Sequence, residues 1–523
     1  MLLGDEAVAQ GAIDAGVSGL YGYPGTPSTE IITYAQRTKE ARDKQVIATW
    51  TVNEKTAMET ALGMSFAGKR SMVTMKHVGL NVAADAFINS AISGINGGLV
   101  VTVADDPSMH SSQNEQDSRV YGKFAMVPIL EPSTPQEAYN LMSYAFNLSE
   151  KVQLPVLMRL TTRLAHSRST VLPADKSAQN ELKTPENSNR FILMPSNAKG
   201  MYQNLIAIQD KLIEISENDN INKFKEGKNK KLGIIASGIG YTYLMDNFSD
   251  SEIEYPTLKI SQYPLPISKI KKLYDECDQI LVIEEGYPVI EEFIKDNINP
   301  DSIKIIGKLT GHLPRTGELN SDYVKLALGD KPDEISFKSD IEINRMPAMC
   351  TGCGHRDLYD ELNEITRSII GSKVFADIGC YTLGALPPYE AIDTCIDMGA
   401  SITMAKGAAD AGLFPAIAVI GDSTFTHSGM TGLLDAVNDN SPITVLISDN
   451  YTTAMTGGQE TAATGRIAEI CRGIGVEEEH LKVIVPLKKF MKDNVEIIRN
   501  EINYKGVSVI IAQRECVKFY KKM

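Results

Sequence analysis

The sequence predicts an α/β protein with two doubly wound parallel sheets and a smaller α/β domain between them. Three observations indicate this fold. Short apolar runs alternate with helical patterns, polar stretches divide the chain, and the first and last regions share one layout. The 523 residues, 43% of them hydrophobic and 23% charged, are enough for about three domains of roughly 150 residues each.

The first region, up to about residue 165, carries the clearest alternation. Apolar runs rich in β-branched residues predict buried strands, and the segments between them predict helices. This pattern indicates βαβ units and a mainly parallel sheet. The predicted strands are LYGYP (20–24), VIATWTV (46–52), SMVTMKH (71–77), GLVVTVADD (98–106) and LPVLMRLTT (154–162), and the predicted helices cover 28–41, 54–68 and 80–93.

Polar segments mark the divisions of the chain, because charged and Asn-rich stretches are typical of linkers. These segments are 166–195, 218–231 and 329–343. We therefore expect a first domain over 1–195, a middle α/β domain over 196–340 and a last domain over 341–523.

Composition excludes several classes of protein. A formal charge of −14 argues against binding nucleic acid through its phosphates. The N-terminus has no basic segment before an apolar run, and no stretch approaches the roughly 20 apolar residues of a membrane span. Seven cysteines without a repeating framework do not indicate a secreted disulfide protein. We expect a cytoplasmic enzyme that is not bound to a membrane.

The first and last regions repeat one spacing. His77 and Asp105 are 28 residues apart, as are Asp422 and Asn450, and each pair follows two successive predicted strands. Doubly wound sheets in general show similar spacings, so this pattern alone leaves open whether the regions are related. Two similar domains nevertheless favour a site built between them.

The most informative motif is the pair of strand ends at Gly421-Asp422 and Asp449-Asn450. Parallel strands end at one edge of a sheet, where ligands bind, so Asp422 and Asn450 are candidate Mg²⁺ ligands beside a diphosphate. Gly421 permits close approach, and the following helix N-terminus offers N–H groups. The spacing resembles the thiamine diphosphate motif, with Ser423 in place of its third-position glycine; an unrelated Rossmann-like sheet is the alternative.

Longer motifs resemble indolepyruvate:ferredoxin oxidoreductase, alpha subunit, in collinear order from about residue 4 to about residue 517. The resemblance implies a pyrimidine-binding first domain, a transketolase C-terminal-like middle domain and a diphosphate-binding last domain. The motifs are GYPGTPSTEI (22–31), NEKTAMETALGMSFAG (53–68), MKHVGLN (75–81), ADDPSMHSSQNEQDSR (104–119), DIGCYTLG (377–384) and DMGASITMAKGAADAG (397–412).

The resemblance also implies an activity: oxidative decarboxylation of aryl 2-oxoacids with coenzyme A, with electrons passing to ferredoxin. Glu54 is then the partner of the thiamine pyrimidine at N1′, although a glutamate at a helix start is also favourable by itself. By the same resemblance Asp422, Asn450 and the backbone of Thr452 hold Mg²⁺. The other implied cofactor-binding residues are Gly354, His355, Cys380, Tyr381, Thr382, Met398, Gly399, Gly421 and Ser423.

Further side chains are candidates for the substrate side of the site. By resemblance Thr26 contacts the 2-oxoacid, although Pro24 to Pro27 also make a good turn. His77 and Lys76, at a predicted strand end, either bind a carboxylate and tune proton transfer or are simply packed. The loop residues Asp105, Asp106, His110 and Gln113 either line the substrate entrance or support a dimer contact.

Four cysteines, Cys350, Cys353, Cys380 and Cys516, follow the order of the [4Fe–4S] ligands in related 2-oxoacid oxidoreductases. Zinc ligands or unligated remnants are the alternatives, and a disulfide is disfavoured. The other cysteines, Cys277, Cys395 and Cys471, are expected to be ordinary buried thiols.

The chain stops at IIAQRECVKFYKKM, without the ferredoxin-like domain usual in this family. The resemblance therefore implies a separate ferredoxin and a smaller beta subunit, in a dimer or dimer of heterodimers. A non-oxidative thiamine-dependent decarboxylase or carboligase stays open, whereas intact Glu54, Asp422 and Asn450 argue against a scaffold without activity.

Overall fold

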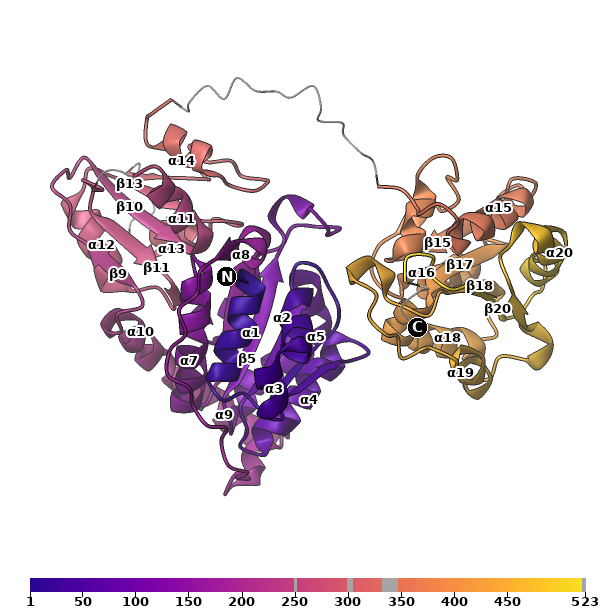
Figure 1. Ribbon diagram of the computed structural model, residues 1–523, viewed down its shortest axis with the longest axis horizontal. Helices are drawn as coiled ribbons and strands as arrows, with labels where there is room; N and C mark the ends of the chain where they lie inside the picture. Colours follow the sequence, from indigo (N-terminus) through magenta and orange to yellow (C-terminus); the bar gives the residue numbers. More distant parts are fainter. Residues whose placement is uncertain (249–251, 299–303, 332–346, 520–523) are drawn as a thin grey trace. The chain divides into compact units, whose positions relative to one another are not determined.

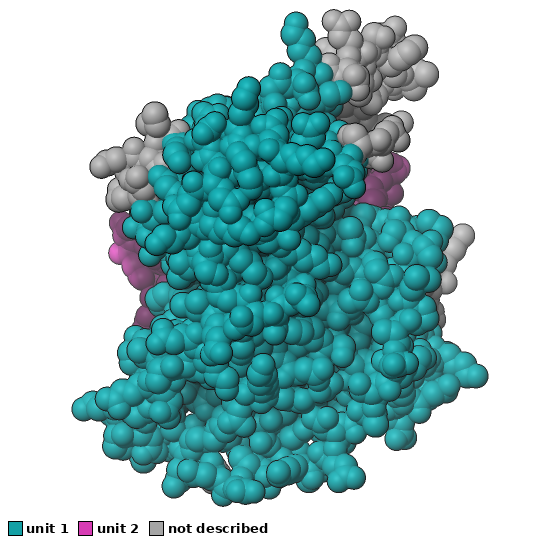
Figure 2. All heavy atoms as spheres, turned by 90° about the vertical axis from the view of Figure 1, so that its left-hand side faces the viewer, with its two compact units in different colours: residues 1–336 teal, residues 337–523 magenta. Residues whose placement is uncertain are grey.

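The computed structural model describes residues 1–248, 252–298, 304–331 and 347–519. The chain divides into two compact units, Met1–Ser336 and Phe337–Met523, which Figure 2 colours separately. Each unit is built around parallel sheets whose central strands are buried on both faces (Figure 1). The predicted connector 329–343 lies outside the described residues from 332 onward.

The first unit contains a seven-stranded sheet in the order β12-β6-β7-β5-β4-β2-β3. Its strands are parallel except for β12, which pairs antiparallel with β6. All five strands predicted in this region are present. The bounds are β2 (Gly19–Gly22), β3 (Ile47–Trp50), β4 (Ser71–Lys76), β5 (Leu99–Asp105), β6 (Ile129–Leu130), β7 (Val156–Thr161) and β12 (Gln262–Tyr263), with a small pair β1 (Leu2–Leu3) and β8 (Arg168–Ser169) beside it.

Two helices of this sheet differ from prediction. The segment predicted as one helix over 28–41 is two, because Thr38 is extended with ψ 135° and separates α2 from α3. Helix α5 begins at His77, so that residue starts a helix instead of ending a strand. The helices are α1 (Gly4–Asp14), α2 (Thr29–Arg37), α3 (Lys39–Asp43), α4 (Glu54–Phe66), α5 (His77–Ser93), α6 (Ser118–Ala125), α7 (Pro135–Val152), α8 (Thr162–His166), α9 (Pro195–Ala207) and α10 (Gln209–Asn218).

The first unit also contains a five-stranded sheet in the order β14-β13-β10-β11-β9. Its edge strand β9 lies inside 218–231, so the prediction that this whole segment is a linker is wrong: Phe224 is half-buried and its strand pairs with β11. The elements are β9 (Lys223–Lys225), β10 (Leu232–Ser237), α11 (Gly238–Asp246), β11 (Thr257–Ile260), α12 (Ile267–Glu276), β13 (Gln279–Ile283), α13 (Val289–Asn297), β14 (Ile305–Ile306) and α14 (Ser321–Ala327).

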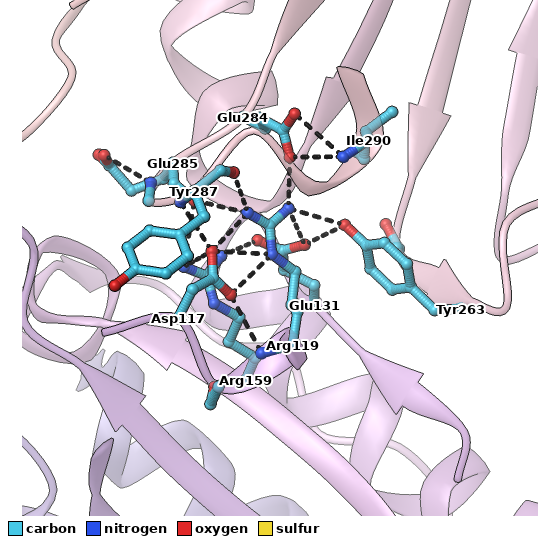
Figure 3. A network of polar contacts seen from close by, with 12 residues as sticks. Asp117, Arg119, Glu131, Arg159, Tyr263, Glu284, Glu285, Tyr287 and Ile290 are labelled. Atoms are coloured by element: carbon cyan, nitrogen blue, oxygen red, sulfur yellow. Dashed lines mark hydrogen bonds and ion pairs between the residues drawn. The ribbon is translucent and has the colours of Figure 1, made fainter. Parts of the chain in front are cut away.

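A buried network of charges joins the two sheets of the first unit (Figure 3). Arg119, from α6, donates to Asp117 at 2.6 Å and to Glu284, beyond β13, at 2.8 Å. Arg159, from β7, donates to Asp105 at 2.6 Å and also pairs with Glu131. Both guanidinium groups are fully enclosed, so their carboxylate partners are what make the burial tolerable.

The second unit contains one six-stranded, wholly parallel sheet in the order β16-β15-β17-β18-β20-β19. From Asp422 the chain runs through a π-turn at Phe425–Gly429 into α18. The elements are α15 (Gly354–Thr366), β15 (Lys373–Ala376), β16 (Thr394–Cys395), α16 (Ala400–Asp410), β17 (Ala416–Gly421), α17 (Asp422–Thr424), α18 (Met430–Asn438), β18 (Ile443–Asp449), α19 (Ile467–Ile474), β19 (Leu481–Ile484), α20 (Met491–Ile502) and β20 (Ser508–Gln513).

The repeated spacing corresponds to a repeated arrangement. β4 and β5 are parallel neighbours, as are β17 and β18, and a helix begins directly after β4 and β17. His77 and Asp422 therefore occupy equivalent positions in the two units. No helix among the described residues is long and apolar enough to cross a membrane.

Candidate active site

The end of β17 places Asp422 at the edge of the second unit's sheet. Its carboxylate is buried; Oδ1 accepts a hydrogen bond from the Ser423 backbone at 2.8 Å, while Oδ2 has no hydrogen-bond partner. Burial, and next the charge of Asp449, raise the pKa of Asp422 above its ordinary range. A buried carboxylate with an unused oxygen beside a second carboxylate is suited to a cation.

The loop after β18 meets Asp422's segment directly, because Thr453 Oγ1 donates to Ser423 Oγ at 3.0 Å. Asn450 Oδ1 accepts from the Thr452 backbone at 3.1 Å, and Tyr451 between them has a left-handed φ of 61°. The structure therefore brings together the segments that carry the predicted Mg²⁺ ligands Asp422, Asn450 and Thr452.

These residues fit a magnesium ion. The dication would offset the repulsion between Asp422 and Asp449, and oxygen donors are the ligands that Mg²⁺ prefers. No three His, Cys, Asp or Glu side chains among the described residues are grouped for a metal ion. A site completed by an amide and a backbone oxygen does not need a third such side chain.

Asp377, which the sequence reasoning missed, organises the predicted cofactor-binding residues. Oδ1 accepts a hydrogen bond from Tyr381 Oη, and Oδ2 accepts from the Gly399 backbone at 3.2 Å and from Ser401 Oγ at 2.6 Å. Burial raises its pKa to about 6. The available signal was a lone carboxylate directly after an apolar strand, the position in which Asp422 was recognised.

Two glycines of the predicted cofactor site have little room for a side chain. A Cβ on Gly421 would lie 2.7 Å from the Tyr381 ring, and one on Gly399 would lie 2.6 Å from Ser428 Cβ. Gly399 also has a φ of 94°, which favours glycine, and it caps α16 directly after the half-buried Met398. Thr382 Oγ1 accepts from the Gly379 backbone at 3.0 Å and holds the turn that carries Cys380.

All four cysteines of the predicted cluster line one cavity of about 220 Å³ in the second unit. Cys350 is exposed and the other three are half-buried. Asn450 and His355 line the same cavity, together with apolar side chains that include Leu383 and Met455. The cavity therefore places the thiols next to one of the predicted Mg²⁺ ligands.

Two of the thiols, those of Cys353 and Cys380, are in a low-polarity setting. Burial, and next the neighbouring Cys353, raise the pKa of Cys380 to about 12. Cys353 Sγ lies 3.0 Å from Nδ1 of His355, whose pKa burial lowers to about 4, so that imidazole is neutral at pH 7. Gly354 begins the helix between them.

All seven cysteines are free thiols within the described residues. Cys277 and Cys471 are buried as expected. The expectation that Cys395 is buried is wrong. Cys395 is only half-buried in β16, and its thiol lies 3.7 Å from the Asp377 carbonyl oxygen.

The first unit carries Glu54 at the first turn of α4. Asn53 caps this helix, since its side chain accepts from the Thr56 backbone at 2.9 Å. Glu54 is 5% exposed, and a Cβ on Gly79 would lie 2.5 Å from its Oε1. The carboxyl group is therefore fixed against the start of α5.

His77 and Lys76 lie at the same edge. His77 Nε2 is 3.2 Å from both oxygens of Asn114, and its buried Nδ1 has no hydrogen-bond partner. Burial lowers the pKa of Lys76, whose Nζ donates to the Ser111 carbonyl at 3.2 Å. Thr26 belongs to the same cluster, because its carbonyl accepts from Ser111 Oγ at 3.1 Å.

The loop after β5 has structural contacts. Asp105 is enclosed and bound to Arg159, and Asp106 accepts from Ser111, Ser112 and Thr162, which fixes the loop. Neither aspartate is exposed at a substrate entrance, so that interpretation is wrong for both. His110 is an exposed partner of Glu318 at 3.4 Å, and Gln113 is exposed.

Two family models match the chain. The model described as pyruvate flavodoxin/ferredoxin oxidoreductase, thiamine diphosphate-binding, matches residues 10–221, and the model of the thiamine pyrophosphate enzyme C-terminal TPP-binding domain matches residues 377–512. Together with the two sheets that carry equivalent strand-to-helix turns, they confirm the predicted fold class.

Curated relatives match over nearly the full length of this chain. Indolepyruvate oxidoreductase subunit IorA of Archaeoglobus fulgidus is 36% identical over 550 residues, covering 100% of this chain and 87% of the relative. The corresponding subunit of Methanothermobacter marburgensis is 37% identical, with 99% and 86% covered. That of Thermococcus kodakarensis is 36% identical, with the same coverage, 99% and 86%.

Similarity to solved structures is weaker. A 2-oxoglutarate:ferredoxin oxidoreductase from Magnetococcus marinus is 17% identical, with a TM-score of 0.46 over 58% of this chain and 61% of that one. A thiamin diphosphate-dependent enzyme from Mycobacterium smegmatis is 13% identical, with a TM-score of 0.28 over 99% and 100%. At these TM-scores neither similarity supports an argument about this chain.

The matched thiamine-binding models and the curated relatives define the class as thiamine diphosphate-dependent oxidoreductases acting on 2-oxoacids. Within this class the chain belongs to the family of indolepyruvate oxidoreductase subunit IorA.

Proposed function

We propose that the chain is the thiamine-binding subunit of an enzyme that oxidatively decarboxylates aryl 2-oxoacids with coenzyme A, giving an aryl-acetyl-CoA and CO₂. The observation that carries the oxidative part is the single cavity lined by Cys350, Cys353, Cys380 and Cys516. Four thiolates are the ligand set of a [4Fe–4S] cluster. Within the described residues these thiols share the cavity without being grouped as a metal site, so the proposal requires them to draw together around the cluster. The relatives' names support indolepyruvate as the type of substrate.

Bound thiamine diphosphate supplies a carbon nucleophile for the ketone carbon and accepts the electron pair released with CO₂. In this proposal Glu54 holds a proton at the pyrimidine nitrogen N1′. Asp422, Asn450 and the Thr452 carbonyl would hold Mg²⁺ on the diphosphate, while Gly421 and Gly399 leave the space that Tyr381 and Ser428 occupy. Lys76, beside Thr26 and His77, provides a positive charge for the carboxylate of the 2-oxoacid.

A bound [4Fe–4S] cluster supplies a one-electron acceptor. Cys353 also lines a groove with four basic residues, Arg356, Lys488, Lys489 and Arg514. Among the described residues that line this groove, only Asp357 and Asp360 are acidic. A basic groove beside the thiols, in a chain of net charge −14, supports an acidic electron carrier such as a separate ferredoxin. A smaller beta subunit and a dimeric assembly complete the proposal.

The first experiment measures iron and redox activity in anaerobically purified protein. We expect about four irons per chain for one [4Fe–4S] cluster, and viologen reduction that requires both indolepyruvate or phenylpyruvate and coenzyme A. Cys380→Ser should remove the iron and the visible absorption of the cluster, whereas Cys277→Ala should retain both. An iron-free protein that releases an aryl acetaldehyde would contradict the oxidative proposal in favour of a non-oxidative decarboxylase.

The second experiment tests Glu54. Glu54→Gln should bind thiamine diphosphate in calorimetry but lose turnover by roughly 100-fold or more, the usual range for a lost acid–base group. Glu59→Gln is the matched control, because Glu59 lies exposed on the same helix. Normal turnover in Glu54→Gln would show that the role of Glu54 is wrong.

A further inference from the structure

The five-stranded sheet carries a cavity that the proposed reaction does not use. It has a volume of about 610 Å³ and lies where β9, β11 and the start of α11 meet. That volume is within the range of small-molecule sites, roughly 300–1,000 Å³. Its lining includes four lysines and two aromatic rings, and no aspartate or glutamate among the described residues: Lys223, Phe224, Lys225, Tyr241, Lys259 and Lys269.

The lysines are concentrated on paired strands. Lys223 of β9 stands directly opposite Lys259 of β11 in the antiparallel ladder, a placement of like charges that is unfavourable by itself and that Glu137 relieves at Lys259. Lys259 is 8% exposed and pairs with Glu137 at 2.5 Å, whereas Lys223 and Lys225 are exposed. Lys269 Nζ donates to the Asn222 carbonyl at 2.8 Å.

The charge at this cavity is therefore positive although the chain as a whole carries −14. Among the described residues one carboxylate, Glu137, offsets Lys259, and no ion pair is formed by Lys223 or Lys225, whose charges are therefore open to a ligand. Lysine ammonium groups act as point charges for phosphate and need no fixed orientation. A ligand with two or more phosphate charges satisfies this arrangement better than a single carboxylate.

The rings indicate what else the ligand contains. Tyr241 is half-buried and lines the cavity. Phe224 also lines it but belongs to the opposite face of β9 from Lys223 and Lys225, where Lys272 Nζ lies 4.6 Å from its ring centroid. Lys259 Nζ lies 4.8 Å from the Tyr241 ring centroid, which fixes that ring beside the charges. A planar heterocycle can stack on such a surface. An inorganic anion would gain nothing from the rings.

From this juxtaposition we propose that the cavity binds an adenosine diphosphate moiety, with its phosphates on Lys223 and Lys225 and its base against Tyr241. The moiety occurs in free ADP or ATP and also in coenzyme A. The site is formed wholly within the first unit, so its binding test does not depend on the proposed reaction.

The test is calorimetric titration of the full-length protein with ADP, coenzyme A, adenosine and inorganic pyrophosphate. We expect ADP or coenzyme A to bind at micromolar to low millimolar concentration, with affinity falling as salt rises, and at least tenfold tighter than adenosine or pyrophosphate. Lys223→Glu/Lys225→Glu should weaken binding at least tenfold. Lys228→Glu/Lys231→Glu is the matched control, since it makes the same charge change on exposed lysines of the same segment outside the cavity.

Tyr241→Leu separates stacking from charge. It should weaken ADP binding and leave the weak pyrophosphate binding unchanged. Pyrophosphate that binds as tightly as ADP, or binding unaffected by Lys223→Glu/Lys225→Glu, would overturn the proposal, as would the absence of ADP and coenzyme A binding up to several millimolar.

Comparison of the two ligands identifies the source. Coenzyme A that binds at least tenfold tighter than ADP, with a KM for coenzyme A raised by Lys223→Glu/Lys225→Glu, identifies the co-substrate. Tighter binding of ADP with an unchanged KM for coenzyme A identifies a free nucleotide. Loss of viologen reduction in the unmodified enzyme, with ADP binding intact, would count against the reaction and not against this site.

Discussion

At the scale of single residues, the position of Glu54 depends on the absence of a Cβ atom at Gly79. Gly79 leaves the space in which the Glu54 carboxyl group lies, and a Cβ there would be 2.5 Å from Oε1. We expect Gly79→Ala to displace Glu54 and lower turnover at least tenfold, while the helical position tolerates alanine otherwise. Steady-state kinetics with viologen, together with a thermal unfolding curve, measure both effects.

Gly63→Ala is the control for that substitution. Gly63 lies in α4, the helix that Glu54 begins, and nothing is within 4 Å of an added Cβ. This substitution should leave turnover unchanged and stabilise the protein by roughly 0.5–1 kcal/mol, because alanine favours a helix. Equal turnover in the two variants would show that Gly79 does not position Glu54.

Residue patterns predicted part of the candidate site. Asp422 and Asn450 were found because each follows an apolar strand at a recognisable spacing, and the structure joins their segments. The sequence does not single out Asp377, because two of its partners, Gly399 and Ser401, lie 22 and 24 residues further along the chain and only the fold brings them to it. Asp105 and Asp106 look like site residues in sequence, and only the position of Arg159 shows that Asp105 is structural.

At the scale of elements, α15 and α20 pack around a buried carboxyl group. Glu361 of α15 is 1% exposed, Asn494 of α20 donates to its Oε1 at 2.8 Å, and Oε2 has no hydrogen-bond partner. Burial raises its pKa to about 7. This group therefore keeps its proton in the folded protein under conditions in which the unfolded chain has lost it.

The sign of the pH effect follows from that raised pKa. Between the ordinary value of 4.5 and about 7 the folded state binds one more proton than the unfolded state, so stability falls as pH rises through this window. In the unsubstituted protein the free energy of unfolding should fall by on the order of 1–3 kcal/mol between pH 4.5 and 8 because of Glu361. We expect Glu361→Gln to abolish this fall. Urea midpoints from circular dichroism at the two pH values measure it. The exposed Glu364 of the same helix provides the control Glu364→Gln, and an equal pH slope in both variants would contradict the prediction.

Element boundaries show where sequence patterns lose information. The alternation of apolar runs predicted the strands of the first sheet, but not that α5 begins at His77, since Lys76 and His77 continue the run in sequence. The edge strand β9 was also missed. Its Lys-Phe-Lys sequence has the charge of a linker, and only pairing with β11 makes it a strand.

At the scale of the whole molecule, the network around Arg119 joins the two sheets of the first unit. Removing one member of a buried ion-pair network leaves uncompensated charges and costs about 3–5 kcal/mol. We expect Arg119→Met to lower the thermal midpoint sharply, because Asp117 and Glu284 lose their shared partner. Differential scanning calorimetry measures the change.

Arg163→Ala provides the comparison for that prediction. Arg163 also forms an ion pair, with Glu318, but its side chain is 60% exposed. Exposed pairs contribute about 0–1 kcal/mol, so this substitution should change the midpoint little. If Arg119→Met lowers the thermal midpoint no more than Arg163→Ala does, the network does not stabilise the first unit.

The strand β12 has a consequence for how the protein is made. Gln262 and Tyr263 belong to the chain of the five-stranded sheet, yet they pair with β6 at the edge of the seven-stranded sheet. A nascent chain that has left the ribosome only as far as residue 195 lacks this strand, so Ile129 and Leu130 are still an open edge able to pair with another chain. Completion of the first sheet must wait for about 70 more residues of synthesis, since β12 begins at residue 262. Fragments that end before β12 should therefore aggregate on expression, and those that include it should not.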